Sequence, residues 1–323
     1  SPIKIGSVFS TFGFFLEGDV GGDEISFTGS SSSSDRKTSS SESPAIILPN
    51  CLHSSTLPCF KVQPSILERI FFSLESLGQT MQWLPEGWYP KIVAVDIDGT
   101  LTDDKKRLSI VAIESLRKLE ENGIPVILST GNVRPVAYGL WRFLGLSGPI
   151  CCENGGVIWH TNWDETVVRA SGNEAYDAAT WLATQIEGLD AEGIESNKWR
   201  ESEWCLFPDE DLEAITEAIK RSVWSHLSVV RTGFAVHLMD PVVSKGQGLA
   251  DLCDRFGWSK DDLLCVGDAP NDLSMFDFCN WAVAVGGAFD VVKDAADVRS
   301  PLLHGETFGP LVDAIIFAKN ALS

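Results

Sequence analysis

From Lys91 onward, short apolar runs alternate with segments of helical spacing, and this alternation restricts the fold more than any other feature of the chain. The apolar runs are rich in β-branched residues, as in strands that are buried on both faces. Strand–helix alternation of this kind implies a parallel sheet with helices on both sides, and so the α/β class. The expected strands are residues 92–95, 125–128, 149–152, 263–266 and 281–285, and the expected helices are 108–119, 134–144, 245–256, 269–276 and 308–321.

The pattern changes between about residues 157 and 241. Helices are expected at 174–186 and 211–223, and strand-like stretches at 195–198, 203–207, 227–231 and 233–239. A helix followed by two strands, repeated twice, predicts a separate small α+β domain. We therefore predict a core made of residues 89–156 and 242–323, and an inserted α+β cap of residues 157–241.

The first part of the chain does not share this organisation. The segment from Gly29 to Pro44 is dominated by serine, a composition that buries too little apolar surface to stay ordered. The first methionine of the chain is Met81, just before the first expected strand. We expect residues 1–88 to be a low-complexity leader that is disordered or not native to the folded protein.

Charge and cysteine content narrow the range of partners. The formal net charge of -20 argues against nucleic acid or an anionic membrane as a partner, because both are bound through basic patches. No apolar run approaches the roughly 20 residues that span a bilayer. The spacing of the eight cysteines fits neither a zinc site nor a disulfide scaffold, so we expect reduced thiols and a cytoplasmic protein. A homodimer is compatible with the sequence.

Polar clusters follow three of the expected strands, and parallel sheets bind ligands at the carboxyl ends of their strands. Asp96 and Asp98 are two residues apart at such an end, so the strand period places both side chains on the same side. One carboxylate can attack phosphorus, and the other can protonate the leaving oxygen and then deprotonate water. Both can also bind a hard cation. The alternative interpretation is a turn or a helix cap.

Three further positions complete a predicted phosphate-transfer site. Thr130 follows the second strand, and its hydroxyl can hydrogen-bond a phosphate oxygen, although its cluster is also typical of a capped turn. Lys245 supplies a cation to offset the carboxylates, although most lysines are solvated surface charges. Asp268 and Asp272 surround a helix start, where a carboxylate has either a capping role or a metal role.

These clusters occur in the order of the four motifs of the haloacid dehalogenase superfamily of phosphohydrolases, which residues 91–323 resemble. The resemblance implies a Rossmann-like core, Mg²⁺ dependence and an aspartyl-phosphate intermediate. In the fourth motif, Ala269 and Pro270 replace the commoner Ser-Glu, but neither is an expected metal ligand. The matched residues are Asp96-Ile97-Asp98-Gly99-Thr100, Thr130, Lys245 and Gly267-Asp268-Ala269-Pro270-Asn271-Asp272.

The resemblance also implies a role for each matched residue. Asp96 would be the nucleophile and Asp98 the general acid/base. Thr130 and Lys245 would hold the phosphoryl group, and Asp272 would support the lysine. The expected catalytic residues are therefore Asp96, Asp98, Thr130 and Lys245, the substrate-binding residues Thr130, Asn132, Lys245 and Asn271, and the Mg²⁺ site Asp96, Asp98, Asp268 and Asp272.

Finer features are similar to the archaeal-type phosphoglycolate phosphatases. They are Thr130-Gly131-Asn132, Glu153-Asn154-Gly155-Gly156, Thr232-Gly233-Phe234-Ala235-Val236-His237 and Val243-Ser244-Lys245-Gly246. This similarity implies a phosphatase of a small phosphorylated metabolite, with 2-phosphoglycolate as the expected substrate.

Two other classes of function are compatible with the same motifs. One is a sugar-phosphate phosphatase of the sucrose-phosphatase-like or Cof-like kind, or a phosphomannomutase-like phosphomutase. The other is a catalytically silent binding protein, which the presence of every expected catalytic residue argues against. In the cap, Arg200, Arg231 and His237 are candidates to bind a substrate carboxylate, although arginine is more often a solvated surface residue and a strand histidine is more often packed.

Overall fold

The computed structural model describes residues 81–323. The prediction for residues 1–80 lies outside the described residues. Residues 81–88, which the sequence placed in the leader, pack on the core. Leu84 is buried, the Trp88 Nε1 donates to the Asp261 carbonyl at 2.9 Å, and the Trp281 Nε1 donates to the Trp83 carbonyl at 3.0 Å. Burial of the apolar side chains in residues 81–88 explains why this segment packs on the core. The assignment of these residues to a low-complexity leader did not take this burial into account.

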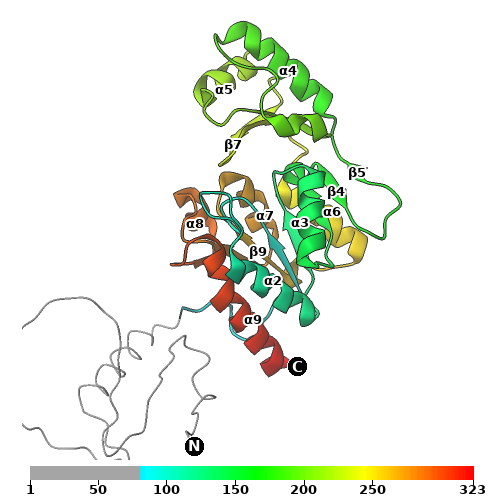
Figure 1. The fold of residues 1–323 in the computed structure, drawn as a ribbon, viewed down its shortest axis with the longest axis vertical. Coiled ribbons are helices and arrows are strands. Elements are labelled where there is room, and N and C mark those ends of the chain that lie inside the picture. The colour runs from blue at the N-terminus through cyan, green and yellow to red at the C-terminus, as the bar shows by residue number, and fades with distance from the viewer. Residues whose placement is uncertain (1–80) are drawn as a thin grey trace, which may run out of the picture. The chain divides into compact units, whose positions relative to one another are not determined.

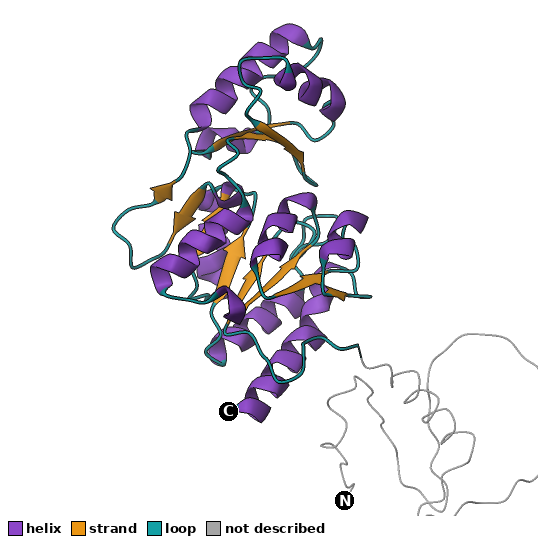
Figure 2. Cartoon of the chain, turned by 180° about the vertical axis from the view of Figure 1, so that it is seen from behind, coloured by secondary structure: helices purple, strands orange, loops and turns teal. Residues whose placement is uncertain are grey.

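A large sheet forms the centre of the core, with helices on both sides (Figures 1 and 2). Its strand order is β11-β10-β9-β1-β2-β3-β4-β5. The pairs from β11 to β3 are all parallel, as predicted. The strands are β1 (Ile92–Val95), β2 (Val126–Ser129), β3 (Ile150–Cys152), β4 (Val157–Trp159), β5 (Val167–Val168), β9 (Leu263–Gly267), β10 (Trp281–Ala284) and β11 (Val298–Arg299).

The helices of the core pack against the buried apolar strands of this sheet. On one side α2 packs against α3 and α9, and on the other α6 packs against α7. Every residue of β1, β2 and β9 is buried, as the continuous apolar runs predicted. The helices are α2 (Ile110–Glu121), α3 (Arg134–Leu144), α6 (Lys245–Phe256), α7 (Leu273–Phe278), α8 (Asp290–Ala295) and α9 (Phe308–Leu322), with 3₁₀ turns η1 (Glu153–Gly155), η3 (Lys260–Asp262), η4 (Pro270–Asp272) and η5 (His304–Thr307).

The edge of the large sheet differs from the prediction. Strands β4 and β5 pair antiparallel with β3 and with each other, so the sheet is mixed rather than wholly parallel. The sequence analysis placed residues 157–168 in the cap, but the strands at both ends of this segment, β4 and β5, belong to the large sheet. The glycine pair before β4 allows the tight reversal that returns the chain beside β3. We therefore propose that the cap begins after Val168 and ends near residue 241.

The inserted segment has its own sheet and its own apolar core. Strand β8 (Val236–Met239) lies between β6 (Glu203–Leu206) and β7 (Ser228–Arg231), with antiparallel pairing on both sides. The helices α4 (Gly172–Gln185) and α5 (Leu212–Lys220) pack against each other and bury a cluster that includes Leu182, Ile215 and Leu238. One face of the small sheet is thus occupied by these helices.

One predicted strand of the cap is a 3₁₀ turn instead, η2 (Glu195–Trp199). Its residue Asn197 is buried, and its side-chain amide bonds to both backbone groups of Cys205. The Asn197 Nδ2 donates to the Cys205 carbonyl at 2.7 Å, and the Cys205 N–H donates to the Asn197 Oδ1 at 3.1 Å. The Asn197 side chain therefore binds backbone groups at the edge of β6 that a fourth strand would otherwise have bound.

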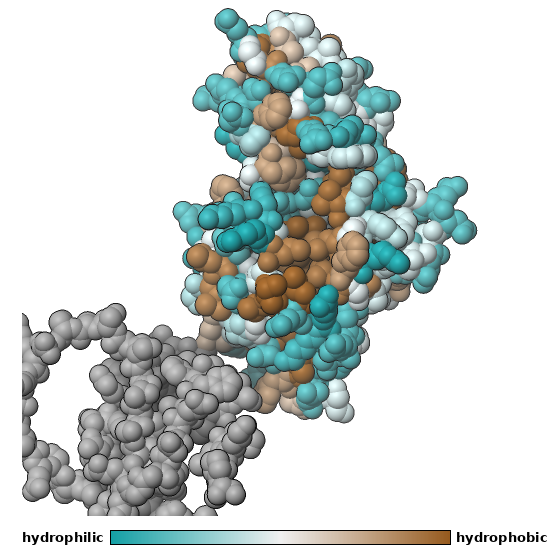
Figure 3. Space-filling model, in the orientation of Figure 1, coloured by the Kyte–Doolittle hydropathy of each residue, from teal (hydrophilic) through white to brown (hydrophobic). Residues whose placement is uncertain are grey.

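In the space-filling view, apolar residues gather over the large-sheet part of the face shown, and hydrophilic residues surround them (Figure 3). Among the described residues, no helix is both long enough and apolar enough to cross a membrane.

Candidate active site

The predicted nucleophile lies at the centre of the large sheet. Asp96 directly follows β1, which pairs with β2 on one side and β9 on the other. From β1 the strand order proceeds to β2 and β3 on one side, and from β9 to β10 and β11 on the other. The strand order thus reverses next to β1, and α/β sheets form their ligand crevice at such a switch point. Asp96 is only 4% exposed, and its Oδ1 accepts a hydrogen bond from the Lys245 Nζ at 2.7 Å.

Lys245 joins two carboxylates. It is the first residue of α6 and is fully buried, and its Nζ also donates to the Asp272 Oδ1 at 2.5 Å. Burial alone would lower the pKa of the Lys245 ammonium, but the carboxylates of Asp272 and Asp96 outweigh it and raise the pKa above its ordinary value. The site therefore holds a permanent cation beside Asp96.

Asp268 approaches from the neighbouring strand, since it directly follows β9. Its Oδ1 accepts a hydrogen bond from the Thr100 Oγ1 at 2.7 Å. Gly99 has a φ of +86°, and a Cβ at this position would lie 2.4 Å from the Asp268 Oδ2. Both the left-handed backbone and this close approach require glycine. The turn after β1 is thus shaped around the Asp268 carboxylate.

The carboxylates of Asp96, Asp268 and Asp272 form a buried group that can hold a cation, with one oxygen of each within 4.8 Å of the others. Burial, together with the charge of Asp272, raises the pKa of Asp268 to about 7. Burial also raises the pKa of Asp96, against the effect of Lys245. A cation would relieve this repulsion, and an all-oxygen donor set suits a hard cation such as Mg²⁺.

Within this group, Asp272 has a different environment from the other two. Its Oδ1 is bound by Lys245, and its Oδ2 accepts the backbone N–H groups of Asp268 and Ala269 at 2.9 and 3.0 Å. These contacts favour a supporting role for Asp272, while Asp96 and Asp268 are better placed to be direct ligands.

Asp98 lies at the more open side of the site, with 18% of its side chain exposed. Its Oδ2 accepts a hydrogen bond from the Asn132 Nδ2, and its Oδ1 lies 2.9 Å from the Lys106 Nζ. The Asn132 backbone N–H donates to the Thr130 Oγ1 at 3.0 Å. The segment after β2 is therefore joined to the segment after β1, as the shared sheet edge predicted.

A turn between the core and the cap makes contacts that the sequence analysis missed. In η1, the φ angles of Glu153, Asn154 and Gly155 are +49°, +54° and +92°, so three successive residues are left-handed. The Asn154 Oδ1 accepts from the Asn271 Nδ2 at 2.9 Å, and the Asn154 Nδ2 donates to the Glu203 Oε2 at 3.0 Å. Backbone strain of this kind persists only where the surroundings enforce it. In the sequence, the adjacent glycines Gly155 and Gly156 were the feature that could have indicated this turn.

The cap sheet contributes a second buried group, Glu203, Cys205 and His237. The His237 Nδ1 lies 3.0 Å from the Glu203 Oε2 and 3.1 Å from the Cys205 Sγ, and its Nε2 lies 3.0 Å from the Thr232 Oγ1. Asn154 and Arg200 already donate to Glu203. The side chains of Glu203, Cys205 and His237 thus already have hydrogen-bond partners, which favours a structural role for them over a metal centre.

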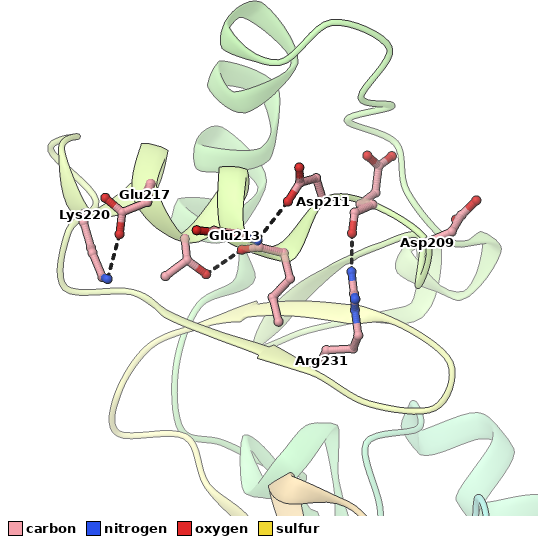
Figure 4. Close-up of a pocket in the computed structure, with 9 residues that line it drawn as sticks. Asp209, Asp211, Glu213, Glu217, Lys220 and Arg231 are labelled. Carbon is pink, nitrogen blue, oxygen red and sulfur yellow. Dashed lines mark hydrogen bonds and ion pairs between the residues drawn. The ribbon is translucent and has the colours of Figure 1, made fainter.

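The two arginines singled out in the cap lie in different places. The Arg200 Nη1 donates to the Gly131 carbonyl at 3.0 Å, one residue after Thr130. Arg231 instead borders a hollow of about 690 Å³ that is lined by cap residues alone (Figure 4). Its Nη2 donates to the Glu210 carbonyl, and acidic residues such as Asp209 and Asp211 line the same hollow. Only Arg200 contacts the segment that carries the predicted phosphate-binding residues.

Comparison with known proteins gives a consistent result. The profile described as haloacid dehalogenase-like hydrolase matches residues 93–187 and 197–302. A phosphoglycolate phosphatase of Archaeoglobus fulgidus is 38% identical over 219 residues, which cover 67% of this chain and 93% of that protein. One of Methanothermobacter thermautotrophicus is 37% identical, covering 67% of this chain and 94% of that protein.

Solved structures agree on the fold. A crystal structure of a Thermoplasma acidophilum protein superimposes with a TM-score of 0.64 at 28% identity, covering 73% of this chain and 100% of that one. A subclass IIB sugar phosphatase of the haloacid dehalogenase superfamily superimposes with a TM-score of 0.55 at 17% identity, covering 72% of this chain and 99% of that one.

Proposed function

This chain belongs to the haloacid dehalogenase-like hydrolase family and is a phosphoric monoester hydrolase, and we propose that it is a Mg²⁺-dependent phosphatase that converts 2-phosphoglycolate to glycolate and phosphate. One observation carries the proposed chemistry. A buried carboxylate, Asp96, lies at the switch point of the sheet beside the fixed cation of Lys245, with a second carboxylate, Asp98, two residues further on.

In the proposed reaction, a carboxylate oxygen of Asp96 forms a bond to phosphorus while the bond from phosphorus to the ester oxygen breaks. Asp98 donates its proton to that leaving oxygen, which departs as the hydroxyl of glycolate. Asp98 then takes a proton from water, whose oxygen bonds to phosphorus as the bond to Asp96 breaks. Lys245 and Thr130 hold the phosphoryl oxygens, and the lysine charge offsets the negative charge that develops there.

The cation would be held by the carboxylates of Asp96 and Asp268, together with the backbone carbonyl of Asp98. When bound, Mg²⁺ would neutralise phosphate charge and polarise the phosphorus–oxygen bonds. Asp272 would keep the Asp268 backbone and Lys245 in position, as its hydrogen bonds to both suggest.

Support for 2-phosphoglycolate comes from the relatives whose name states that activity and of which more than nine-tenths is covered. The likeness to a sugar phosphatase is at 17% identity and supports only a common fold. A phosphomutase would return the phosphoryl group to a sugar and would depend on a bisphosphate activator.

The test is a comparison of kcat/KM for 2-phosphoglycolate and for several hexose phosphates, with phosphate release as the readout. We expect 2-phosphoglycolate to be preferred and no bisphosphate to be required. A clear preference for a hexose phosphate would refute the substrate while leaving a phosphatase, and a bisphosphate requirement would indicate a mutase.

A further inference from the structure

Arg200 has an unoccupied hydrogen-bonding edge that is buried between the cap and the core. The Arg200 side chain has no exposed surface. Its Nη1 donates to the Gly131 carbonyl and to Glu203, whereas its Nε and Nη2 are buried and have no hydrogen-bond partner among the described residues. Buried donors are seldom left unpaired, so this pair calls for an explanation.

The unpaired atoms are the two that form one side of the guanidinium fork. The Nε–H and the adjacent Nη2–H groups are parallel, and this edge binds the two oxygens of a carboxylate at once. Elsewhere in the chain, the same two atoms of Arg107 both donate to one oxygen of the Asp103 carboxylate, Oδ2. Arg200 therefore presents a complete bidentate carboxylate site whose other edge fixes it to the protein.

The position of this edge suits a substrate group. Gly131, to which Arg200 is anchored, directly follows Thr130, and a Cβ at Gly131 would lie 3.3 Å from ring atoms of Phe234 and His237 on the cap. The cap thus closes over the segment expected to bind phosphate. In 2-phosphoglycolate only one methylene group separates the phosphate ester oxygen from the carboxylate, so the carboxylate must lie close to that segment.

Other cations of the cap and the crevice are less suitable. Arg231 has an unpaired Nε as well, but its Nη2 is already bound to the Glu210 carbonyl, so its fork edge is not free. The hollow beside it is lined by Asp209, Asp211 and other acidic residues, which repel a carboxylate (Figure 4). Lys106 is about half exposed and is paired with Asp98.

We propose that the Nε and Nη2 atoms of Arg200 bind the carboxylate of the substrate, and that this contact selects phosphorylated hydroxy acids over other phosphate esters. The inference rests on the proposed function, which supplies the carboxylate. Because the edge has no exposed surface in this structure, the substrate carboxylate reaches it only when the cap is displaced from this arrangement.

The experiment compares 2-phosphoglycolate with ethyl phosphate, which has the same chain length and no carboxylate, in the full chain and its variants. Arg200→Lys keeps the charge and loses the fork. We expect kcat/KM for 2-phosphoglycolate to fall about tenfold to a hundredfold, the effect of losing one or more charge-assisted hydrogen bonds. The value for ethyl phosphate should fall much less, because ethyl phosphate has no carboxylate to lose, so the ratio of the two values should fall as well. Arg231→Lys is the matched control and should alter neither value.

The ratio of the two kcat/KM values is independent of the amount of folded enzyme, so it remains informative if Arg200→Lys lowers stability. Arg200→Met gives a second measurement of the same ratio. The proposal is overturned if Arg200→Lys keeps the wild-type ratio, if both substrates are affected equally, or if Lys106→Gln removes the preference in its place. Absence of any preference in the wild type would instead refute the proposed substrate itself.

Discussion

Replacing Asn154 with alanine should weaken the connection between the cap and the core. Asn154 is 1% exposed, and its amide accepts from the Asn271 Nδ2 and donates to the Glu203 Oε2. Losing these two bonds costs about 2–4 kcal/mol, because the Glu203 carboxylate stays buried and the Asn271 amide stays partly buried. Alanine at a φ of +54° costs about 1 kcal/mol more. The sum is about 3–5 kcal/mol.

For a chain of this size, that loss corresponds to a decrease in melting temperature of roughly 6–20 °C. Thermal unfolding followed by circular dichroism measures it, with Asn162→Ala as the control because Asn162 is exposed. Asn154→Gly removes the same hydrogen bonds but tolerates the left-handed backbone, so its melting temperature should fall between those of the wild type and Asn154→Ala. A melting temperature of Asn154→Ala within about 1 °C of the wild type would refute the assigned hydrogen bonds.

Three further outcomes follow. Burial alone would raise the pKa of the Glu203 carboxyl, but His237 and Arg200 outweigh it and hold the pKa below 4.5. This stabilisation is present above pH 4.5 and is lost as the pH falls through the folded-state pKa, so the difference in melting temperature between the wild type and Glu203→Gln should narrow there. A difference in melting temperature that stays constant with pH would contradict the lowered pKa of Glu203. A chain that begins at Met81 should keep full specific activity, whereas one that begins at Tyr89 should lose about 2 kcal/mol or more of stability in chemical denaturation; equal stability would show that residues 81–88 contribute nothing. Exhaustive chelation should abolish phosphatase activity and added Mg²⁺ should restore it, whereas full activity after chelation would exclude a metal requirement.

The parts of the fold that the sequence predicted best are those governed by local pattern. The strand Ile92–Val95 and the helices Arg134–Leu144 and Lys245–Phe256 match their expected limits, because continuous apolar runs and helical periodicity act within one element. The expected helix 269–276 is divided into a 3₁₀ turn and α7, since the Asp272 side chain binds backbone N–H groups at its start. Helical periodicity in the sequence does not reveal these hydrogen bonds between a side chain and the backbone.

Contacts between distant segments were the features that the sequence could not supply. Asn197 replaces a strand by bonding to Cys205, and Asn154 joins Asn271 to the cap. For the candidate site, motif order identified the residues that lie at the strand ends, but not which oxygen of Asp272 each donor occupies. It also could not choose between Arg200 and Arg231, because that choice depends on which guanidinium edge is left without a partner.

The central claim is that Asp96 becomes covalently phosphorylated, and a rapid-quench experiment tests it most directly. The enzyme is mixed with 2-phosphoglycolate that carries a radiolabelled phosphate, quenched in acid and digested. We predict a label on the peptide that contains Asp96, released by hydroxylamine as expected for an acyl phosphate, and none in a folded Asp96→Asn variant, which should also lack turnover. Near wild-type turnover by folded Asp96→Asn would contradict the mechanism.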